Sequence, residues 1–198
     1  MWNSMKRKRS VRNRRARRCL FLILLALLAL LLIWPRTVHL EGLVSPYAIL
    51  VDADSGEAVA EKEADVSIYP ASMTKVMTAL LALEANPDLE QPVTLPEDIF
   101  PELRAEGASM AGFRPGETAT VRDLLYGALL PSGAECCEAL AREVSGSEEA
   151  FVELMNQKAA ELGMRSTHFC NPTGLHDPEH VSTVRDMARL LRAAMQNE

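Results

Sequence analysis

The longest run of uncharged, mostly apolar residues extends from Cys19 to Trp34, directly after a strongly basic segment. At about 1.5 Å per residue, a helix over this run would be about 24 Å long, slightly short of a roughly 30 Å hydrocarbon core. The first 18 residues contain nine Lys and Arg and no acid. Under the positive-inside rule the pattern predicts a basic cytoplasmic tail at 1–18, a transmembrane signal anchor at 19–35, a linker at 36–45 and an extracytoplasmic remainder. This places the protein in the cell membrane with a single pass.

Two other interpretations of this segment are weaker. A cleaved signal peptide would need a site of small residues, and Pro35–Leu40 contains none. Nucleic-acid binding would explain the basic residues, but they directly precede an apolar run. In addition, residues 37–198 carry 11 Lys and Arg against 27 Asp and Glu, a net charge of −16. An acidic outer part argues against a nucleic-acid partner.

Beyond the linker, the pattern of apolar and polar positions predicts a hairpin followed mainly by helices. The expected elements are strands at Tyr47–Asp52 and Glu57–Lys62, a helix from Ser72 to Ala85, a short strand around Val93–Leu95, and helices at Val121–Leu130, Ala134–Val144, Glu148–Leu162 and from Val184 onward. The first of these helices has apolar residues nearly all round, so we expect it to be buried. Residues 91–118, rich in proline and glycine, predict an irregular segment.

The segment Tyr69–Lys75 places a serine hydroxyl at the start of a predicted helix and a lysine amine three residues later. Residues three apart share a helix face, so Lys75 can reach the hydroxyl of Ser72. A serine hydroxyl needs a base to attack at neutral pH, and a lysine is a base only when neutral. Burial and the helix dipole both lower a lysine pKa, so we expect a lowered pKa at Lys75. Ser72 is the candidate nucleophile and Lys75 its general base.

Further motifs follow in a fixed order. They are Leu124–Glu135, which includes Pro131-Ser132-Gly133-Ala134, then Gly146-Ser147, Phe151-Val152, Met155-Asn156, Leu162-Gly163-Met164, Thr167-His168-Phe169, Asn171–Leu175 and Ser182-Thr183. With these motifs, residues 46–198 resemble a serine-type D-alanyl-D-alanine carboxypeptidase, a low-molecular-mass penicillin-binding protein. The resemblance implies an α/β (α+β) domain with the penicilloyl-serine transferase fold, which β-lactamases and transpeptidases share.

The resemblance also implies a function and partners. Ser72 would attack the penultimate D-alanine of a peptidoglycan stem peptide ending in D-alanyl-D-alanine, and β-lactam antibiotics would acylate the same hydroxyl. Lys75 would be the base, and Ser132 would relay a proton between Lys75 and the leaving amine. No cofactor and no metal is implied, and the sequence identifies no substrate-binding residue. Asn171–Leu175 is expected to be a structural turn, with Gly174 at positive φ.

Two departures from the family pattern qualify this expectation. Ala134 stands where the Ser-x-Asn motif has an asparagine amide that holds the substrate. The third motif, Lys-Thr-Gly, does not occur in the 198 residues. We therefore expect the front part of such an enzyme, with the C-terminal strands of its sheet missing. Two alternatives stay open: an inactive remnant that binds peptidoglycan, and a serine β-lactamase, whose Ser-Asp-Asn motif and deacylating glutamate are not evident.

Cysteines and histidines predict little further chemistry. Cys136 and Cys137 are expected to pack as small apolar residues, while a disulfide from Cys170 to one of them stays open. A Ser-His-Asp arrangement would draw on His168, His176, His180, Asp177 and Asp186. The segment 176–180 is also a weak candidate for a metal site. Both are less favoured than Ser72 with Lys75.

Overall fold

The computed structural model describes residues 38, 40, 42–86 and 88–197. The predicted cytoplasmic tail and signal anchor lie outside these residues. None of the helices in the described part is both long enough and apolar enough to cross a membrane.

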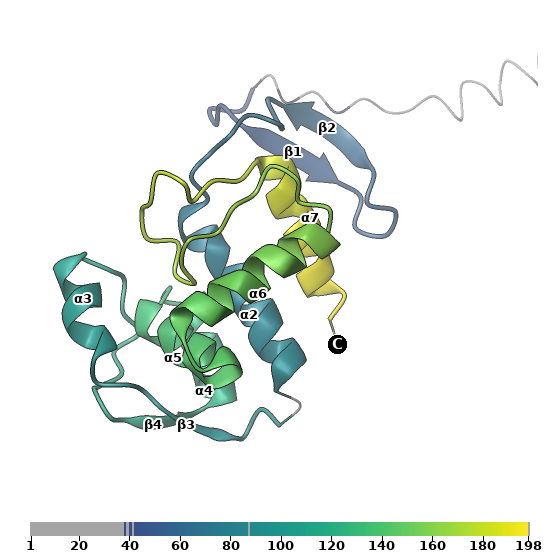
Figure 1. The fold of residues 1–198 in the computed structure, drawn as a ribbon. Coiled ribbons are helices and arrows are strands. Elements are labelled where there is room, and N and C mark those ends of the chain that lie inside the picture. Colours follow the sequence, from purple (N-terminus) through teal and green to yellow (C-terminus); the bar gives the residue numbers. More distant parts are fainter. Residues whose placement is uncertain (1–37, 39, 41, 87, 198) are drawn as a thin grey trace, which may run out of the picture. The chain divides into compact units, whose positions relative to one another are not determined.

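The described chain begins with the expected antiparallel hairpin. Strand β1 (Ala48–Val51) pairs with β2 (Ala58–Lys62). Their turn closes around Asp52, whose Oδ1 accepts hydrogen bonds from the backbone N–H and the hydroxyl of Ser55, both at 2.8 Å. The hairpin packs on the last helix, α7 (Val184–Met195), as Figure 1 shows. The first and last described elements are therefore neighbours in space.

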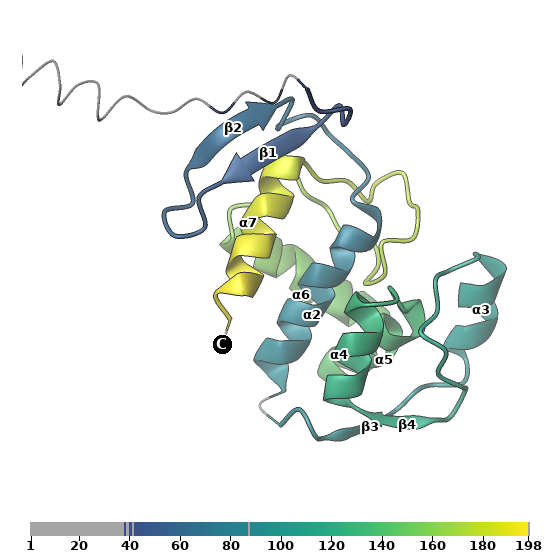
Figure 2. The same ribbon diagram turned by 180° about the vertical axis from the view of Figure 1, so that it is seen from behind.

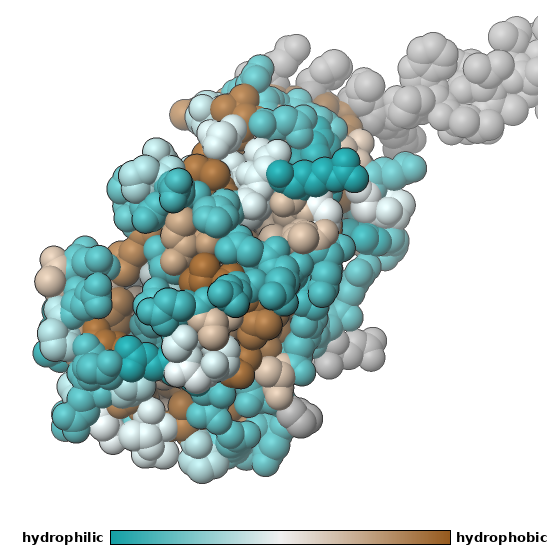
Figure 3. Space-filling model, in the orientation of Figure 1, coloured by the Kyte–Doolittle hydropathy of each residue, from teal (hydrophilic) through white to brown (hydrophobic). Residues whose placement is uncertain are grey.

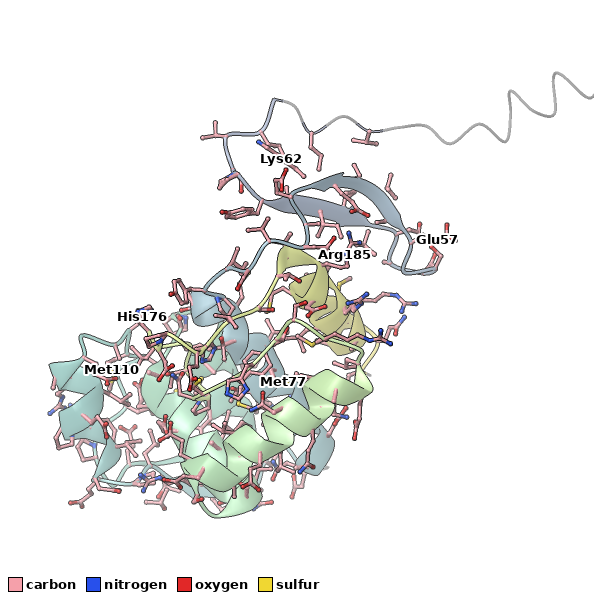
Figure 4. All side chains as sticks on the ribbon, turned by 45° about the horizontal axis from the view of Figure 1, so that its top comes forward. Glu57, Lys62, Met77, Met110, His176 and Arg185 are labelled. Atoms are coloured by element: carbon pink, nitrogen blue, oxygen red, sulfur yellow. The ribbon has the colours of Figure 1, made fainter. Side chains whose placement is uncertain are left out.

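Arg185, at the start of α7, connects this helix to the hairpin. Its guanidinium forms an ion pair with Glu61 of β2 and donates to Asp65 Oδ1 at 2.6 Å. Figure 4 shows Arg185 where α7 meets the hairpin. Hydrogen bonds from Arg185 hold the pKa of both carboxyls below its usual value. Because the carboxylates are largely exposed, we expect these pairs to contribute little to stability.

The remaining helices lie between the two ends of the chain. They are the 3-10 turn η1 (Ala71–Thr74), α2 (Lys75–Ala85), α3 (Ile99–Ala105), α4 (Val121–Leu129), α5 (Ala134–Ser145) and α6 (Glu148–Glu161). Helix α2 contacts α4, α5, α6 and α7, and Figure 2 shows it running through the middle of this group. This confirms the prediction that it is buried.

Side chains cap the starts of α4, α6 and α7. Thr120 Oγ1 accepts the N–H of Asp123 at 3.1 Å, and the Asp123 carboxylate accepts the N–H of Thr120, which completes a capping box. Ser147 caps α6, and Thr183 caps α7. Each cap supplies an acceptor to an N–H at a helix start that has no partner within the helix.

The prediction for residues 91–118 is partly wrong. A second hairpin, β3 (Pro92–Thr94) with β4 (Thr118–Thr120), encloses this segment, and α3 lies inside it. Three apolar side chains of α3, those of Ile99, Phe100 and Leu103, are buried. A helix of seven residues is unstable alone. Tertiary packing therefore stabilises a helix where the proline- and glycine-rich composition indicated none.

Two apolar clusters share α2. One joins it to α3, α4 and α5, with Phe100, Leu124 and Leu140 at its centre; the other joins it to α6 and α7 around Phe151 and Phe169. The outer face in Figure 3 is mostly hydrophilic, with narrow strips of apolar surface. The described part is thus a mixed α and β structure, as predicted, in which helices form most of the core.

We expect Asp186→Ala to lower the free energy of unfolding by about 2–3 kcal/mol. Asp186 is only 2% exposed, and its Oδ2 accepts the Ser166 N–H at 2.9 Å and the Thr167 hydroxyl at 3.0 Å. Hydrogen bonds to a charged group contribute about 1.5–3 kcal/mol each, and the substitution removes the shared acceptor of both donors. Urea denaturation of the two proteins measures the difference.

Asp54→Ala is the matched control for Asp186→Ala. Asp54 is exposed in the turn between β1 and β2. Its replacement is expected to change the free energy of unfolding by about 0.5 kcal/mol or less. Equal losses in the two variants would contradict a structural role for Asp186.

Candidate active site

Ser72, Lys75 and Ser132 meet at one point of the structure. Ser132 Oγ donates a hydrogen bond to Ser72 Oγ at 2.9 Å, and Lys75 Nζ lies 3.4 Å from the same oxygen. Ser72 is exposed on η1, whereas Lys75, the first residue of α2, is only 5% exposed. The structure therefore brings together the residues that the motifs singled out. The hydroxyl faces solvent while the amine is withdrawn from it.

The turn Asn171–Leu175 contacts the backbone of Ala71, the residue directly before Ser72. Ala71 has a φ of +48° and Gly174 has a φ of +78°, and the two residues lie against each other. A Cβ atom at Gly174 would overlap the carbonyl group of Ala71. The positive φ predicted for Gly174 is thus present, and the absence of a side chain there allows the turn to approach the nucleophile's backbone.

The same turn also binds Lys75. The carbonyl of Thr173 accepts a hydrogen bond from Lys75 Nζ at 2.6 Å, shorter than the contact with Ser72. Asn171 organises the turn, because its Oδ1 accepts the N–H of Gly174 at 2.7 Å and that of Thr173 at 3.2 Å. The sequence indicated a structural turn here. Its contact with Lys75, 98 residues away, had no local signal.

The environment of Lys75 favours the neutral amine. Burial lowers the pKa of Lys75, while electrostatic interactions with Cys137 and Glu135 act in the opposite direction. The direction agrees with the prediction, and desolvation of the ammonium form is its main cause. A larger fraction of neutral amine at working pH suits a general base.

A positive φ at Ser132 and the close packing of Gly133 place Ser132 between α4 and α5. Ser132 itself has a φ of +65°. The next residue, Gly133, is packed so closely that a Cβ would lie 2.7 Å from Ala111 Cβ and 2.8 Å from the Gly127 carbonyl oxygen. No larger residue at 133 fits without moving this backbone. The loop is therefore fixed by packing on both sides.

Ala134 and Glu135 begin α5 behind this loop. Ala134 is buried and brings no side-chain polar group to the site, although its N–H donates to the Ser109 carbonyl at 2.8 Å. Glu135 is fully buried, and its Oε1 accepts the N–H groups of Ala111 and Gly112 at 2.7 and 2.9 Å. Glu135 therefore ties the segment before β4 to α5. These contacts of Glu135 had no signal in the sequence.

Among the described residues, no histidine side chain hydrogen-bonds to Ser72, whose hydroxyl contacts Lys75 and Ser132 instead. His180 is buried, and its Nε2 lies 2.8 Å from Thr74 Oγ1 while its Nδ1 accepts the Cys170 N–H at 3.2 Å. Both ring nitrogens are thus occupied away from the nucleophile. His176, labelled in Figure 4, packs edge-on against Tyr69 with the ring centroids 4.8 Å apart. The carboxylate of Asp186 accepts hydrogen bonds from Ser166 and Thr167.

The open question about the cysteines is also answered. Cys136, Cys137 and Cys170 all have free thiols, and the first two are buried as predicted. Burial raises the pKa of the Cys137 thiol to about 12, so it stays protonated. In the described part of the chain, no group of three or more histidine, cysteine, aspartate or glutamate residues is arranged to hold a metal ion.

Comparison with known sequences finds one family over most of the chain. The model of the D-alanyl-D-alanine carboxypeptidase family matches residues 36–198. D-alanyl-D-alanine carboxypeptidase DacF of Bacillus subtilis (strain 168) is 38% identical over 151 residues, covering 76% of this chain and 39% of that protein. DacC of Escherichia coli (strain K12) is 39% identical over 170 residues, covering 82% and 42%. The chain spans about two fifths of the length of these two relatives.

Solved structures agree with this match. The Streptomyces K15 DD-transpeptidase superposes with a TM-score of 0.76 at 31% identity, over 81% of this chain and 64% of that one. Penicillin binding protein 6B from Escherichia coli gives a TM-score of 0.77 at 29% identity, over 83% and 54%. The similarity thus extends to the three-dimensional arrangement of the described residues.

Proposed function

Because this chain belongs to the D-alanyl-D-alanine carboxypeptidase family, we propose that it acts as a serine D,D-carboxypeptidase on peptidoglycan stem peptides. One observation carries the proposal: Ser72 Oγ receives a hydrogen bond from Ser132 and lies 3.4 Å from the buried amine of Lys75. An exposed hydroxyl with a partly desolvated amine beside it has the parts of an activated nucleophile. Ser72 is proposed as nucleophile, Lys75 as general base and Ser132 as proton relay.

The proposed reaction has two halves. Ser72 Oγ forms a bond to the carbonyl carbon of the penultimate D-alanine while its proton passes to the neutral amine of Lys75. The peptide C–N bond then breaks, and a proton passes through the Ser132 hydroxyl to the amine of the departing D-alanine. Water cleaves the resulting ester and restores the Ser72 hydroxyl. A β-lactam would follow the first half, with its ring amide as the bond that breaks.

The location follows from the predicted anchor. We propose that residues 1–18 stay in the cytoplasm, that 19–35 hold the protein in the membrane, and that the catalytic part faces the cell wall. The basic tail and the uncharged run support this arrangement. Fractionation in high salt tests it: the protein should stay with membranes, and external protease should digest residues after Leu40.

Release of D-alanine from a D-alanyl-D-alanine peptide tests the proposed function. The Lys75 and Ser132 contacts with Ser72 favour catalysis over an inactive remnant, whereas Ala134 favours weaker substrate binding. We therefore expect turnover with a high KM. Peptidoglycan binding without D-alanine release would point to the remnant, and rapid hydrolysis of penicillin in place of the peptide would point to a β-lactamase.

We expect Lys75→Met to slow acylation of Ser72 by roughly 10² or more, the usual loss when general-base assistance is removed. Methionine keeps most of the buried volume of the lysine. In the unsubstituted protein, the acylation rate should rise with pH as Lys75 loses its proton and then level off. Because burial lowers the pKa of Lys75, this rise should occur below the ordinary range of a lysine. Stopped-flow fluorescence with a labelled penicillin measures both effects.

Lys158→Met is the control for this experiment. Lys158 lies on α6 and pairs with Glu84 at 2.8 Å and Glu161 at 3.2 Å, away from Ser72. Its replacement should leave the acylation rate and its pH dependence unchanged. A rate in Lys75→Met within twofold of the unsubstituted protein would remove Lys75 from the mechanism.

A further inference from the structure

A recess of about 200 Å³ opens on the side of the Asn171–Leu175 turn. Its walls come from α3, from α5, from the start of α6 and from the loop 170–177. At roughly 30 Å³ for each water, this volume has room for about six or seven non-hydrogen atoms. Asn171 and Thr173 line it, so the turn that binds Lys75 also forms part of this second site.

The charge of the recess is strongly negative. Its titratable or charged lining residues are Glu102 from α3, Glu106 directly after α3, Glu138 and Arg142 from α5, Glu148 from α6, and Cys170, His176 and Asp177 from the loop. The one guanidinium among them is already engaged, because Arg142 Nη1 donates to both carboxylate oxygens of Asp98 at 3.0 and 2.7 Å. Five acidic residues therefore line a space with little compensating positive charge from the described residues.

Glu138 is the group that points to a ligand. Its side chain lines the recess, yet the residue is only 6% exposed, and within the described part of the chain its Oε2 has no hydrogen-bond partner. Burial, aided by the charge of Glu148, raises the pKa of Glu138 to about 8. A buried carboxyl oxygen without a partner is costly, and a positively charged donor would remove that cost.

We propose that this recess binds an organic ammonium group, with Glu138 as its principal acceptor and Glu148 as a second carboxylate. An ammonium ion carries three N–H donors and one positive charge, which suits carboxylates spread over several walls. A metal ion fits less well, because among the described residues these groups are not arranged as a metal-binding cluster. The volume also exceeds that of a bare ion and accommodates a short aliphatic chain behind the ammonium group.

Two sources could supply such a group: a free alkylamine, or the side chain of a diamino-acid residue in a peptide. The two are tested separately with 1,5-diaminopentane and with Nα-acetyl-lysine methylamide. Isothermal titration calorimetry on the full chain in a neutral detergent, at low salt, measures each affinity at pH 7 and pH 9. 1,5-Pentanediol has the same chain length without a charge and serves as the probe control.

Glu138→Gln and Glu153→Gln form the matched pair of variants. Both remove one carboxylate, but Glu153 is exposed on α6 and does not line the recess. We expect Glu138→Gln to weaken binding of the ammonium probe about tenfold, the order of one charged hydrogen bond, and Glu153→Gln to leave it unchanged. Affinity in the unsubstituted protein should rise between pH 7 and pH 9, as Glu138 ionises, and this rise should be absent in Glu138→Gln.

The binding results decide whether the recess takes an ammonium group. Glu138-dependent binding of either ammonium probe supports the proposal, and the stronger of the two identifies the source. The proposal is overturned if neither ammonium probe binds, if the pentanediol binds as well, or if both variants behave alike. It is also overturned if calcium chloride binds with the same dependence on Glu138 while the amines do not. None of these outcomes depends on carboxypeptidase activity.

Discussion

No covalent adduct with a fluorescent penicillin is expected when Ser72 is replaced by alanine, whereas the unsubstituted protein should gain one adduct at Ser72. The hydroxyl of Ser72 is the group that both Ser132 and Lys75 approach, so its removal leaves no nucleophile at their meeting point. Loss of labelling should be complete, because covalent catalysis has no alternative route at this site. Intact-protein mass spectrometry followed by peptide mapping measures the adduct and its position.

Ser166→Ala is the control for the loss of labelling. Ser166 is exposed. Its contact with Asp186 is made by its backbone N–H, which the substitution keeps. The variant should be labelled at the same rate as the unsubstituted protein. If Ser72→Ala still forms a penicillin ester, for example on Ser132, the assignment of the nucleophile is wrong.

Gly174→Ala is expected to destabilise the protein by about 3 kcal/mol or more and to reduce acylation of the fraction that remains folded. The left-handed backbone alone costs a residue with a side chain about 1–2 kcal/mol. The added Cβ would also overlap the Ala71 carbonyl, so either the turn or the segment that carries Ser72 must move. Urea denaturation measures the first effect, and the labelling rate per folded molecule measures the second.

The same substitution at Gly163 separates strain from contact. Gly163 follows α6 with a φ of +72°, but a Cβ there would meet nothing within 4 Å. We expect Gly163→Ala to cost about 1–2 kcal/mol and to leave the labelling rate of the folded protein unchanged. If both variants lose equal stability and both label normally, the contact between Gly174 and Ala71 has no bearing on the site.

The parts of the structure that depend on neighbouring residues could be predicted from the sequence. The helix predicted to begin at Val121 begins there, and Thr120 and Asp123, three residues apart, form its capping box. Ser72 and Lys75 are likewise close in sequence, so helical spacing alone predicted their contact. Ser132 is 60 residues from Ser72, and the order of motifs rather than any local pattern indicated that the two would meet.

Most contacts between distant segments could not be predicted from the sequence. Nothing near Thr173 indicates that its carbonyl accepts a hydrogen bond from Lys75, because any residue has a carbonyl. Glu135 follows Ala134 in a motif, yet its bonds to Ala111 and Gly112 depend on how the segment before β4 folds back. Helix α3 was also not predicted, because it depends on the burial of its apolar side chains against other segments, which outweighs the proline- and glycine-rich composition around it.

The hydrogen bond between Lys75 and Thr173 has a stereoelectronic consequence. A neutral amine has two N–H bonds and one lone pair, in three directions around the bond to the side chain. With one N–H directed at the Thr173 carbonyl, 2.6 Å away, the lone pair is confined to the two directions that remain. One of these directions can face Ser72 Oγ, which lies 3.4 Å from the Lys75 nitrogen. A peptide carbonyl far away in the sequence thus restricts the rotation of the amine and directs its lone pair.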